Sequence, residues 1–168
     1  MVEVYLSLGS NKGDRIRFLS EALTRLQEYG VVSKTSNIYE SEPWGFEADK
    51  NFYNIVVLFQ TQLNPIDLLT EIKNIEFSLG RRKNNSDVYT SRNIDIDIIF
   101  YQDKVIDVPF LQVPHKYAHK RKFVLYPMAE INPYFVHPIL NKNILQLIDL
   151  CQDNTRIKKI SEKKLALV

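Results

Sequence analysis

Hydrophobic residues recur along the chain in two patterns, every second residue in some segments and every third or fourth in others, and these patterns predict strands and helices. Asp14 is placed to cap the first helix, and Gly30 to end it. Asn64 caps a second helix, in which Pro65 takes the first position and which Gly80 ends. The elements expected in the first half are strand 2–8, helix 14–29, strand 31–39, strand 52–60 and helix 64–79.

The second half of the chain opens with a basic loop at residues 81–85 and continues into a strand that carries two aspartates. The order strand, helix, strand, strand, helix, strand is typical of the ferredoxin-like split βαβ pattern. We therefore predict an α+β fold: a ferredoxin-like βαββαβ core with an antiparallel sheet, helices packed on it, and a C-terminal hairpin and helices. The later elements are strand 91–100, a hairpin around residue 103, helices 123–130 and 144–150, and a fraying basic tail over 156–164.

Length and composition are those of one soluble globular domain, which we place at residues 1–160 with a C-terminal tail at 161–168. The sequence is 45% hydrophobic and 25% charged, and it lacks the run of roughly 20 apolar residues that a membrane span needs. Because the N-terminus enters a strand directly, without the features of a signal peptide, we expect a cytoplasmic protein. Cys151 is the only cysteine, which excludes an internal disulfide and a cysteine-based zinc cluster.

Two carboxylates stand two residues apart in a strand that otherwise looks buried. Because side chains alternate along a strand, Asp95 and Asp97 point the same way, about 6.6 Å apart at a rise of roughly 3.3 Å per residue. Two anions so close repel each other, and a divalent cation would balance them. A solvated strand face is the alternative, although Asp is depleted in strands. The alternation places Asp95, Asp97, Ile99 and Tyr101 on one face and Ile94, Ile96, Ile98 and Phe100 on the other.

Basic residues gather on both sides of this strand, at Arg81–Lys83, at Arg92 and over His115–Arg121. Taken singly, each group is a solvated basic surface, but beside a carboxylate pair they are the parts of a phosphoryl-transfer site. The formal net charge of only +2 argues little about nucleic acid. His115 and His119 have the spacing of two metal ligands on a helix, but no glutamate lies between them and Pro114 perturbs its start. We expect His115 to donate to a phosphate or ribose instead.

Aromatic residues and one amide would suit a flat heteroaromatic ligand. Trp44, Phe52 and Phe123 supply faces for stacking, and Asn54 supplies an amide that could recognise a polar edge. Each of these residues, taken singly, is more often part of a core.

Seven motifs in order make the chain resemble a known family, the 6-hydroxymethyl-7,8-dihydropterin pyrophosphokinases of folate biosynthesis. The resemblance covers nearly the whole chain. The motifs are Leu8-Gly9-Ser10-Asn11-Lys12-Gly13-Asp14, Tyr39-Glu40-Ser41-Glu42-Pro43, Phe52-Tyr53-Asn54, Ile75-Glu76 followed by Gly80-Arg81, Arg92-x-x-Asp95-Ile96-Asp97-Ile98, Val113-Pro114-His115 and Arg121-x-Phe123-Val124-Leu125.

The resemblance implies that a pyrophosphate unit passes from ATP to the hydroxymethyl group of the pterin, releasing AMP. It implies two Mg²⁺ ions held by Asp95 and Asp97, which with Arg92 and Arg81 form the catalytic set, Arg81 closing late on a loop. The implied ATP-binding residues are Lys73, Glu76, Arg92, Ile98, His115, Lys116 and Arg121. The implied pterin-binding residues are Ser41, Glu42, Pro43, Trp44, Phe52, Asn54, Tyr89 and Phe123, with the pterin between Phe52 and Phe123.

The same resemblance implies small-molecule substrates rather than nucleic acid or membrane, a monomer, and an association with neighbouring folate-pathway enzymes. Two alternatives stay open. The aspartate pair also suits a metal-dependent nucleotidyltransferase with another acceptor. Ferredoxin-like folds also bind RNA, but that use needs exposed aromatics on the sheet, where this chain has its Asp-Ile-Asp strand.

Overall fold

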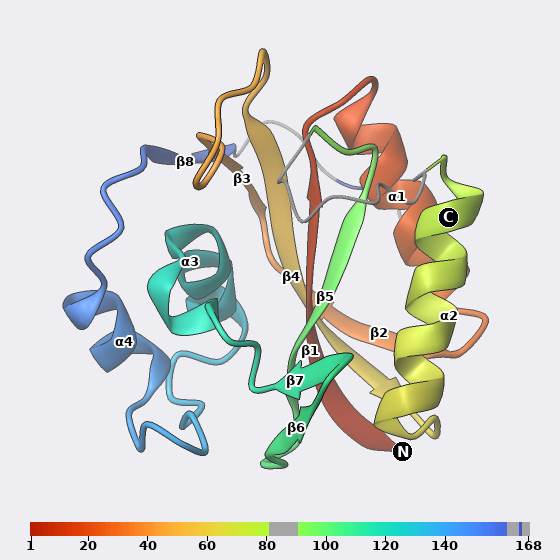
Figure 1. Ribbon diagram of the computed structural model, residues 1–168, viewed down its shortest axis with the longest axis vertical. Coiled ribbons are helices and arrows are strands. Elements are labelled where there is room, and N and C mark those ends of the chain that lie inside the picture. The colour runs from red at the N-terminus through yellow and green to blue at the C-terminus, as the bar shows by residue number, and fades with distance from the viewer. Residues whose placement is uncertain (81–90, 161–164, 166–168) are drawn as a thin grey trace.

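A computed structural model describes residues 1–80, 91–160 and 165, and shows an antiparallel sheet between two layers of helices (Figure 1). The α+β class predicted from the sequence is therefore confirmed. The elements are β1 (Val2–Ser10), α1 (Arg15–Leu26), β2 (Gly30–Thr35), β3 (Ile38–Ser41), β4 (Phe52–Thr61), α2 (Pro65–Ser78), β5 (Asp95–Tyr101), β6 (Ile106–Val108), β7 (Leu111–Val113), a short 3₁₀ helix (Ala118–Lys120), α3 (Lys122–Ile131), α4 (Ile144–Leu150) and β8 (Ile157–Ile160).

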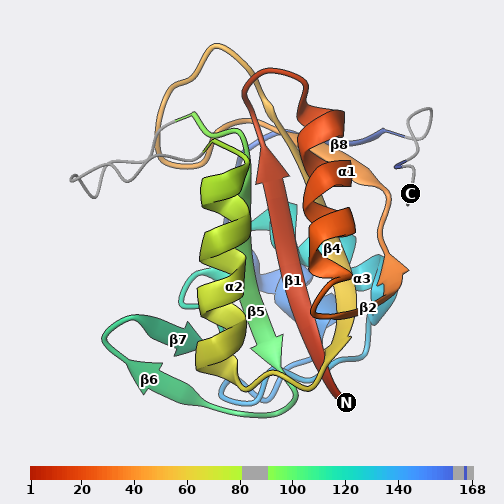
Figure 2. The same ribbon diagram turned by 90° about the vertical axis from the view of Figure 1, so that its right-hand side faces the viewer.

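The main sheet has the strand order β5-β1-β4-β3-β8, and β2 also pairs with β4. β1 lies between its partners β4 and β5 and is antiparallel to both. Figure 2 shows α1 and α2 side by side in front of β1 and β5. β6 and β7 form a separate hairpin below the sheet.

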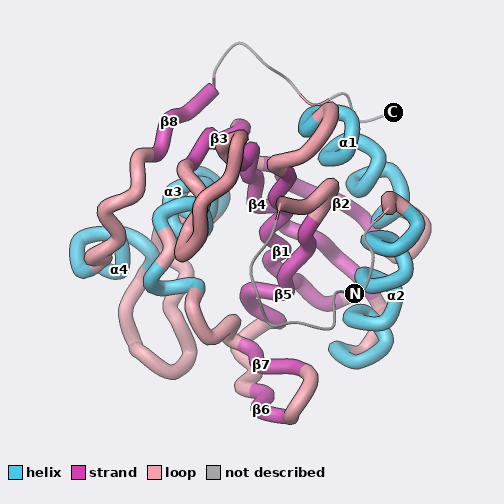
Figure 3. Tube along the Cα trace, turned by 45° about the horizontal axis from the view of Figure 1, so that its top comes forward, coloured by secondary structure: helices cyan, strands magenta, loops and turns pink. Residues whose placement is uncertain are grey.

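Each face of the sheet carries its own hydrophobic core, because helices cover both faces (Figure 3). On the face of α1 and α2, apolar residues of both helices pack on β1 and β4, among them Leu23, Ile72 and Phe59. On the opposite face, α3 and α4 contribute residues such as Met128 and Leu147. This double covering removes the exposed sheet face that the RNA-binding alternative requires.

The predicted helix caps are confirmed, with one correction. The Asp14 side chain accepts a hydrogen bond from Arg17 N, and Asn64 caps α2 in the same way from its position before Pro65. Gly80 has a φ of +90° just beyond α2, a conformation that favours glycine. The first helix, however, ends at Leu26, well before Gly30. Gly30 instead begins β2, where an added Cβ would lie 2.2 Å from the Gln60 carbonyl oxygen.

A bulge in β5 overturns part of the predicted alternation. The register against β1 shifts by one residue, so that Leu6 pairs with Ile98 but Tyr5 pairs with Phe100. An inserted residue reverses the faces of those beyond it. Phe100 consequently packs against Tyr5 in the α3–α4 core, and the Tyr101 hydroxyl donates to the Leu63 carbonyl on the other side. The prediction holds for the residues before the bulge, including both aspartates.

Three further predictions are corrected. The strand predicted over 31–39 is two strands, β2 and β3, broken where Ser36 bonds to Val56 through both its N–H and its hydroxyl. The chain does turn at residue 103, but the hairpin consists of β6 and β7 and turns beyond Val108. The predicted basic tail contains β8, which pairs with β3. Its sequence, Ile157-Lys158-Lys159-Ile160, does not alternate and is too short to indicate a strand.

Glu76 of α2 holds the outer edge of β5. In the described part of the chain β5 pairs within the main sheet with β1 alone, so alternate N–H groups face away from the sheet. The Glu76 carboxylate, only 1% exposed, accepts a hydrogen bond from Ile96 N at 2.8 Å and forms an ion pair with Lys73 at 3.0 Å. The helix thereby fixes the strand that carries the aspartates.

We predict that Glu76→Ala lowers the free energy of unfolding by about 1–3 kcal/mol, because it leaves the buried Ile96 N–H without its acceptor. Urea denaturation measures the change. Asn74→Ala, at an exposed position of the same helix, is the control and should stay within about 0.5 kcal/mol of wild type. Equal stability of the two variants would contradict the role given to Glu76.

We also predict that His137, which is 3% exposed, makes the free energy of unfolding depend on pH. Its Nδ1 accepts hydrogen bonds from Ile139 N and Leu140 N, and burial together with nearby His119 lowers its pKa to about 4. The unfolded state therefore binds more protons between pH 6.5 and pH 4, and stability falls as the pH drops through this window. Urea denaturation of wild type and His137→Asn at several pH values measures the effect: the difference between their free energies of unfolding should be smallest at pH 4. A difference that does not change with pH would refute the assignment.

Candidate functional site

Two pockets meet at the beginning of β5. The smaller has a volume of about 530 Å³ and the larger cleft about 1940 Å³, both including their open mouths. Four charged residues line both pockets: Arg92, Asp95, Asp97 and Arg121. The predicted carboxylates and two of the predicted cations therefore stand at the junction of two spaces of different size.

The strand pairing of β5 leaves its aspartates accessible. Asp95 lies opposite Gly9 of β1, and Asp97 lies opposite Ser7, so small residues stand beside both carboxylates. The side chains of Asp95 and Asp97 are 24% and 30% exposed. Ser7 and Gly9 themselves line the smaller pocket, a role that the sequence prediction missed. The signal was present in the alternation of small residues with buried leucines in β1.

Arg92 is held in place from two directions. Its guanidinium donates to Asp95 Oδ2 at 2.7 Å, and its backbone exchanges hydrogen bonds with Asn11, whose Oδ1 accepts from Arg92 N at 2.7 Å. The turn after β1 thus fixes the entry of β5. The sequence prediction took this turn as structural, and the contact with Arg92 shows how it also positions a site residue.

The electrostatics of the carboxylate pair fit a hard divalent cation. Burial and the charge of Asp95 raise the pKa of Asp97 to about 6, against the opposing effect of Arg121. Burial and the charge of Asp95 both disfavour the ionised form of Asp97, and a bound divalent cation would favour it. No group of three or more His, Cys, Asp or Glu ligands exists among the described residues. Mg²⁺ is typically bound by one or two carboxylates, with phosphate oxygens and water as the remaining ligands.

His115 faces the aspartates as a neutral donor. Burial and the charge of Arg121 lower its pKa to about 4. Because His115 Nδ1 accepts from Tyr117 N at 3.2 Å, the ring proton belongs on Nε2, which lies 3.9 Å from Asp97 Oδ2. His119 turns elsewhere and packs edge-on against His137, with ring centroids 6.0 Å apart.

The larger cleft gathers most of the residues predicted for ATP. Glu76 does not line the cleft; it forms an ion pair with Lys73, which does. Arg81 falls outside the described residues. Those that line the cleft are Lys73, Arg92, Ile98, His115, Lys116 and Arg121.

The smaller pocket combines aromatic rings with few polar groups. Asn54 donates its amide N–H groups to Ser41 Oγ at 2.8 Å and to the Tyr39 carbonyl at 3.2 Å, which leaves its carbonyl oxygen to accept from a ligand. Pro43 does not line the pocket, and Tyr89 falls outside the described residues. Phe46 was not predicted; nothing in its spacing marked it. The lining residues that were predicted for the substrate are Ser41, Glu42, Trp44, Phe52, Asn54 and Phe123.

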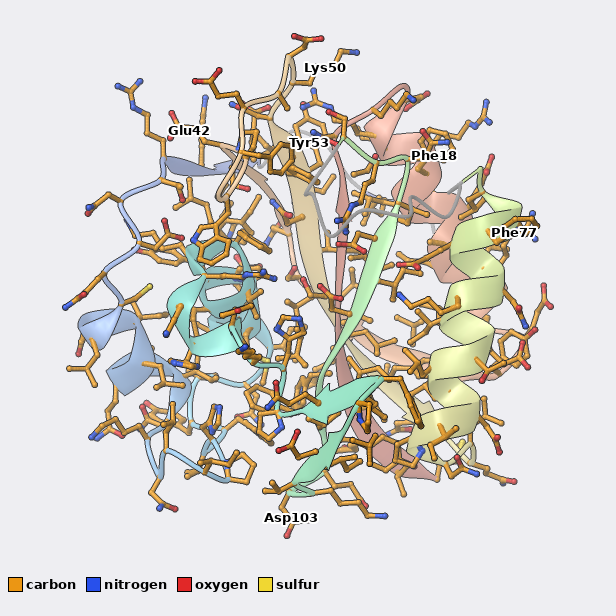
Figure 4. All side chains as sticks on the ribbon, viewed as in Figure 1. Phe18, Glu42, Lys50, Tyr53, Phe77 and Asp103 are labelled. Atoms are coloured by element: carbon orange, nitrogen blue, oxygen red, sulfur yellow. The ribbon has the colours of Figure 1, made fainter. Side chains whose placement is uncertain are left out.

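Glu42 joins this pocket to the C-terminal strand. Its carboxylate accepts from Arg156 N at 3.0 Å, and its own N–H donates to the Arg156 carbonyl at 3.2 Å. Figure 4 shows Glu42 beside β8, at the start of the loop between β3 and β4. The segment before β8 therefore anchors one wall of the pocket.

Comparison with known proteins agrees with this geometry. The family profile of 7,8-dihydro-6-hydroxymethylpterin-pyrophosphokinase (HPPK) matches residues 5–133. The 2-amino-4-hydroxy-6-hydroxymethyldihydropteridine pyrophosphokinase of Aquifex aeolicus is 45% identical over 142 residues, which are 84% of this chain and 88% of that protein. The enzyme of the same name from Porphyromonas gingivalis is 44% identical over 141 residues, 82% of this chain and 95% of that protein.

Solved structures show the same fold within longer chains. A crystal structure of Plasmodium falciparum HPPK-DHPS superposes with a TM-score of 0.72 at 19% identity, over 89% of this chain and 43% of that one. This chain thus spans less than half of that two-part protein. The family profile and the two bacterial relatives establish that the chain belongs to the 7,8-dihydro-6-hydroxymethylpterin-pyrophosphokinase family and is a pyrophosphokinase of folate biosynthesis.

Proposed function

We propose that the enzyme transfers pyrophosphate from ATP to 6-hydroxymethyl-7,8-dihydropterin in a Mg²⁺-dependent reaction that yields AMP and the pterin diphosphate. One observation carries the proposal: two pockets share Asp95, Asp97, Arg92 and Arg121 at their junction. A pterin in the smaller pocket and a nucleotide in the larger cleft would meet at these charges.

The smaller pocket would bind the pterin. Its rings at Phe52 and Phe123 would stack on the two faces of the bicycle, and Asn54 would accept a hydrogen bond from its polar edge. Ser41, Glu42 and the loop through Trp44 would complete the wall. The hydroxymethyl group would then point toward the aspartates.

The larger cleft would bind ATP. Lys73 and Lys116 supply positive charge, His115 supplies a neutral donor, and Ile98 supplies an apolar surface. Glu76 contributes by holding Lys73 rather than by reaching the nucleotide. Arg81 remains a predicted phosphate ligand on the segment outside the described residues.

Asp95 and Asp97 would hold two Mg²⁺ ions. When bound, the ions would supply the positive charge that polyphosphate oxygens require. The hydroxymethyl oxygen would form a bond to the β-phosphorus of ATP and lose its proton to solvent water, as the bond from that phosphorus to the α,β-bridging oxygen breaks and AMP leaves. Arg92 and Arg121 would stabilise the charge on the transferred group through their planar guanidinium N–H groups.

Other features of the proposal concern the setting of the enzyme. The order β5-β1-β4-β3 and the two helices on one face support a ferredoxin-like core. We keep a single domain over 1–160, a monomer and a cytoplasmic location as predictions. Among the helices of the described residues, none has the length and apolarity that crossing a membrane requires. The fused HPPK-DHPS structures support an association with a neighbouring pathway enzyme.

We predict that purified wild type releases AMP, and no ADP, from Mg²⁺ and ATP only when 6-hydroxymethyl-7,8-dihydropterin is present. Asp95→Ala and Asp97→Ala should each lower turnover by about three orders of magnitude or more, because each removes a metal ligand without opening a core cavity. Chromatographic separation of the nucleotides measures both results.

Asp103→Ala is the matched control, since Asp103 is exposed on the turn after β5, as Figure 4 shows, and should keep wild-type turnover. Release of inorganic pyrophosphate in place of AMP would favour the nucleotidyltransferase alternative. Unchanged turnover in both aspartate variants would defeat the metal assignment.

We predict that Phe123→Ala weakens pterin binding about tenfold or more, and ATP binding by less, because it removes one stacking face of the smaller pocket. Calorimetric titration with each ligand separately measures the two affinities. Phe77→Ala, which removes a ring that is 72% exposed on α2, should change neither. Equal losses for pterin and ATP in Phe123→Ala would argue against stacking.

A further inference from the structure

Arg121 lies among three aromatic rings. The carbon centre of its guanidinium is 4.7 Å from the Trp44 ring, 5.3 Å from the Tyr117 ring and 5.5 Å from the Phe123 ring. The Trp44 and Tyr117 rings also contact each other, with centroids 5.8 Å apart. Arg121 is only 5% exposed, so these are contacts of a largely desolvated cation, for which attraction to an aromatic face is strongest.

Trp44 reaches Arg121 from a loop that is fixed at both ends. Glu42 bonds to Arg156 at the beginning of the loop, and Arg15 donates to the Asn51 carbonyl at 2.7 Å at its end. Gly45, directly after Trp44, has a φ of +82°, a conformation that favours glycine. The loop therefore presents Trp44 from a defined position.

The arrangement leaves Arg121 able to bind phosphate. An aromatic ring covers the flat face of a guanidinium, whereas the N–H groups point outward in its plane. A guanidinium held by its face can still donate from its edge to phosphate oxygens. The rings around Arg121 would thus restrict its orientation without occupying its donors.

Arg121 lines both pockets at their junction. It lines the smaller pocket together with Trp44, and it also lines the larger cleft, where Trp44 is not among the lining residues. In the larger cleft it shares the lining with Asp97 and His115. The loop of the smaller pocket is therefore connected to the larger cleft through Arg121, and Tyr117, which Trp44 also contacts, lines that cleft as well.

We propose that Trp44 is a positioning residue for the polyphosphate site: its indole holds the Arg121 guanidinium in the orientation that receives the phosphates of the nucleotide. Trp44 thereby acts on a ligand that binds in the neighbouring cleft, in addition to lining the pterin pocket. The inference rests on the proposed function for the identity of the nucleotide.

The first test titrates the protein with Mg²⁺ and a non-hydrolysable ATP analogue, without pterin, in a calorimeter. Trp44→Ala should weaken binding about tenfold, and Trp44→Phe, which keeps an aromatic face, should bind within about twofold of wild type. Phe52→Ala is the matched control: it truncates another ring of the smaller pocket and should leave analogue binding unchanged while weakening pterin binding.

The second test uses the fluorescence of Trp44, the only tryptophan in the chain. The same analogue should change its emission, although the analogue binds in the larger cleft. Emission that stays constant while calorimetry shows saturation would overturn the proposal. So would analogue binding by Trp44→Ala at wild-type strength, or equal weakening in Trp44→Ala and Phe52→Ala.

Pterin-dependent AMP release by the wild type, measured on the same preparation, separates the two hypotheses. If the wild type releases AMP but Trp44→Ala binds the analogue normally, only the positioning role fails. If the wild type binds the analogue with the expected change in emission but releases no AMP, only the proposed reaction fails.

Discussion

Mutual repulsion of two carboxylates on one strand face is the constraint around which this structure is arranged. Asp95 and Asp97 line the junction of two pockets, where burial and their proximity raise the pKa of Asp97. Arg92 and Arg121 line the same junction, so that two cations and two carboxylates share a small, partly buried space. β5 therefore carries an unfavourable electrostatic interaction, the repulsion between two neighbouring carboxylates, that the groups around it have to offset.

That arrangement requires a strand that is rigid although it lies at the edge of the sheet. β1 supplies the pairing on one side, with small residues opposite the aspartates. Glu76 supplies an acceptor on the other side, and Asn11 fixes the entry of the strand at Arg92. The bulge near the end of β5 then allows Phe100 to join the opposite core without moving the aspartates. Two cores on the two faces of the sheet thus support one short segment.

The pockets are not independent of each other. Trp44 belongs to the loop that walls the smaller pocket, yet it contacts an arginine that lines both. The same loop is held by the segment before β8, so the C-terminal part of the chain contributes to a site whose charges come from β5. The junction of the two pockets is in this way stabilised by contacts between residues far apart in the sequence.

The sequence by itself determined the local features: the capped helices, the strands of the core, the α+β class and the paired aspartates, because each depends on a short periodic pattern or on a few adjacent residues. It also indicated Phe52, Asn54 and Phe123 as ligand-binding residues through family motifs. Only the tertiary structure decided the bulge in β5, the pairing of β8 with β3, the use of Glu76 as an acceptor for Ile96, and the contact of Trp44 with Arg121. These features join residues tens of positions apart, and no local pattern encodes which distant groups will meet.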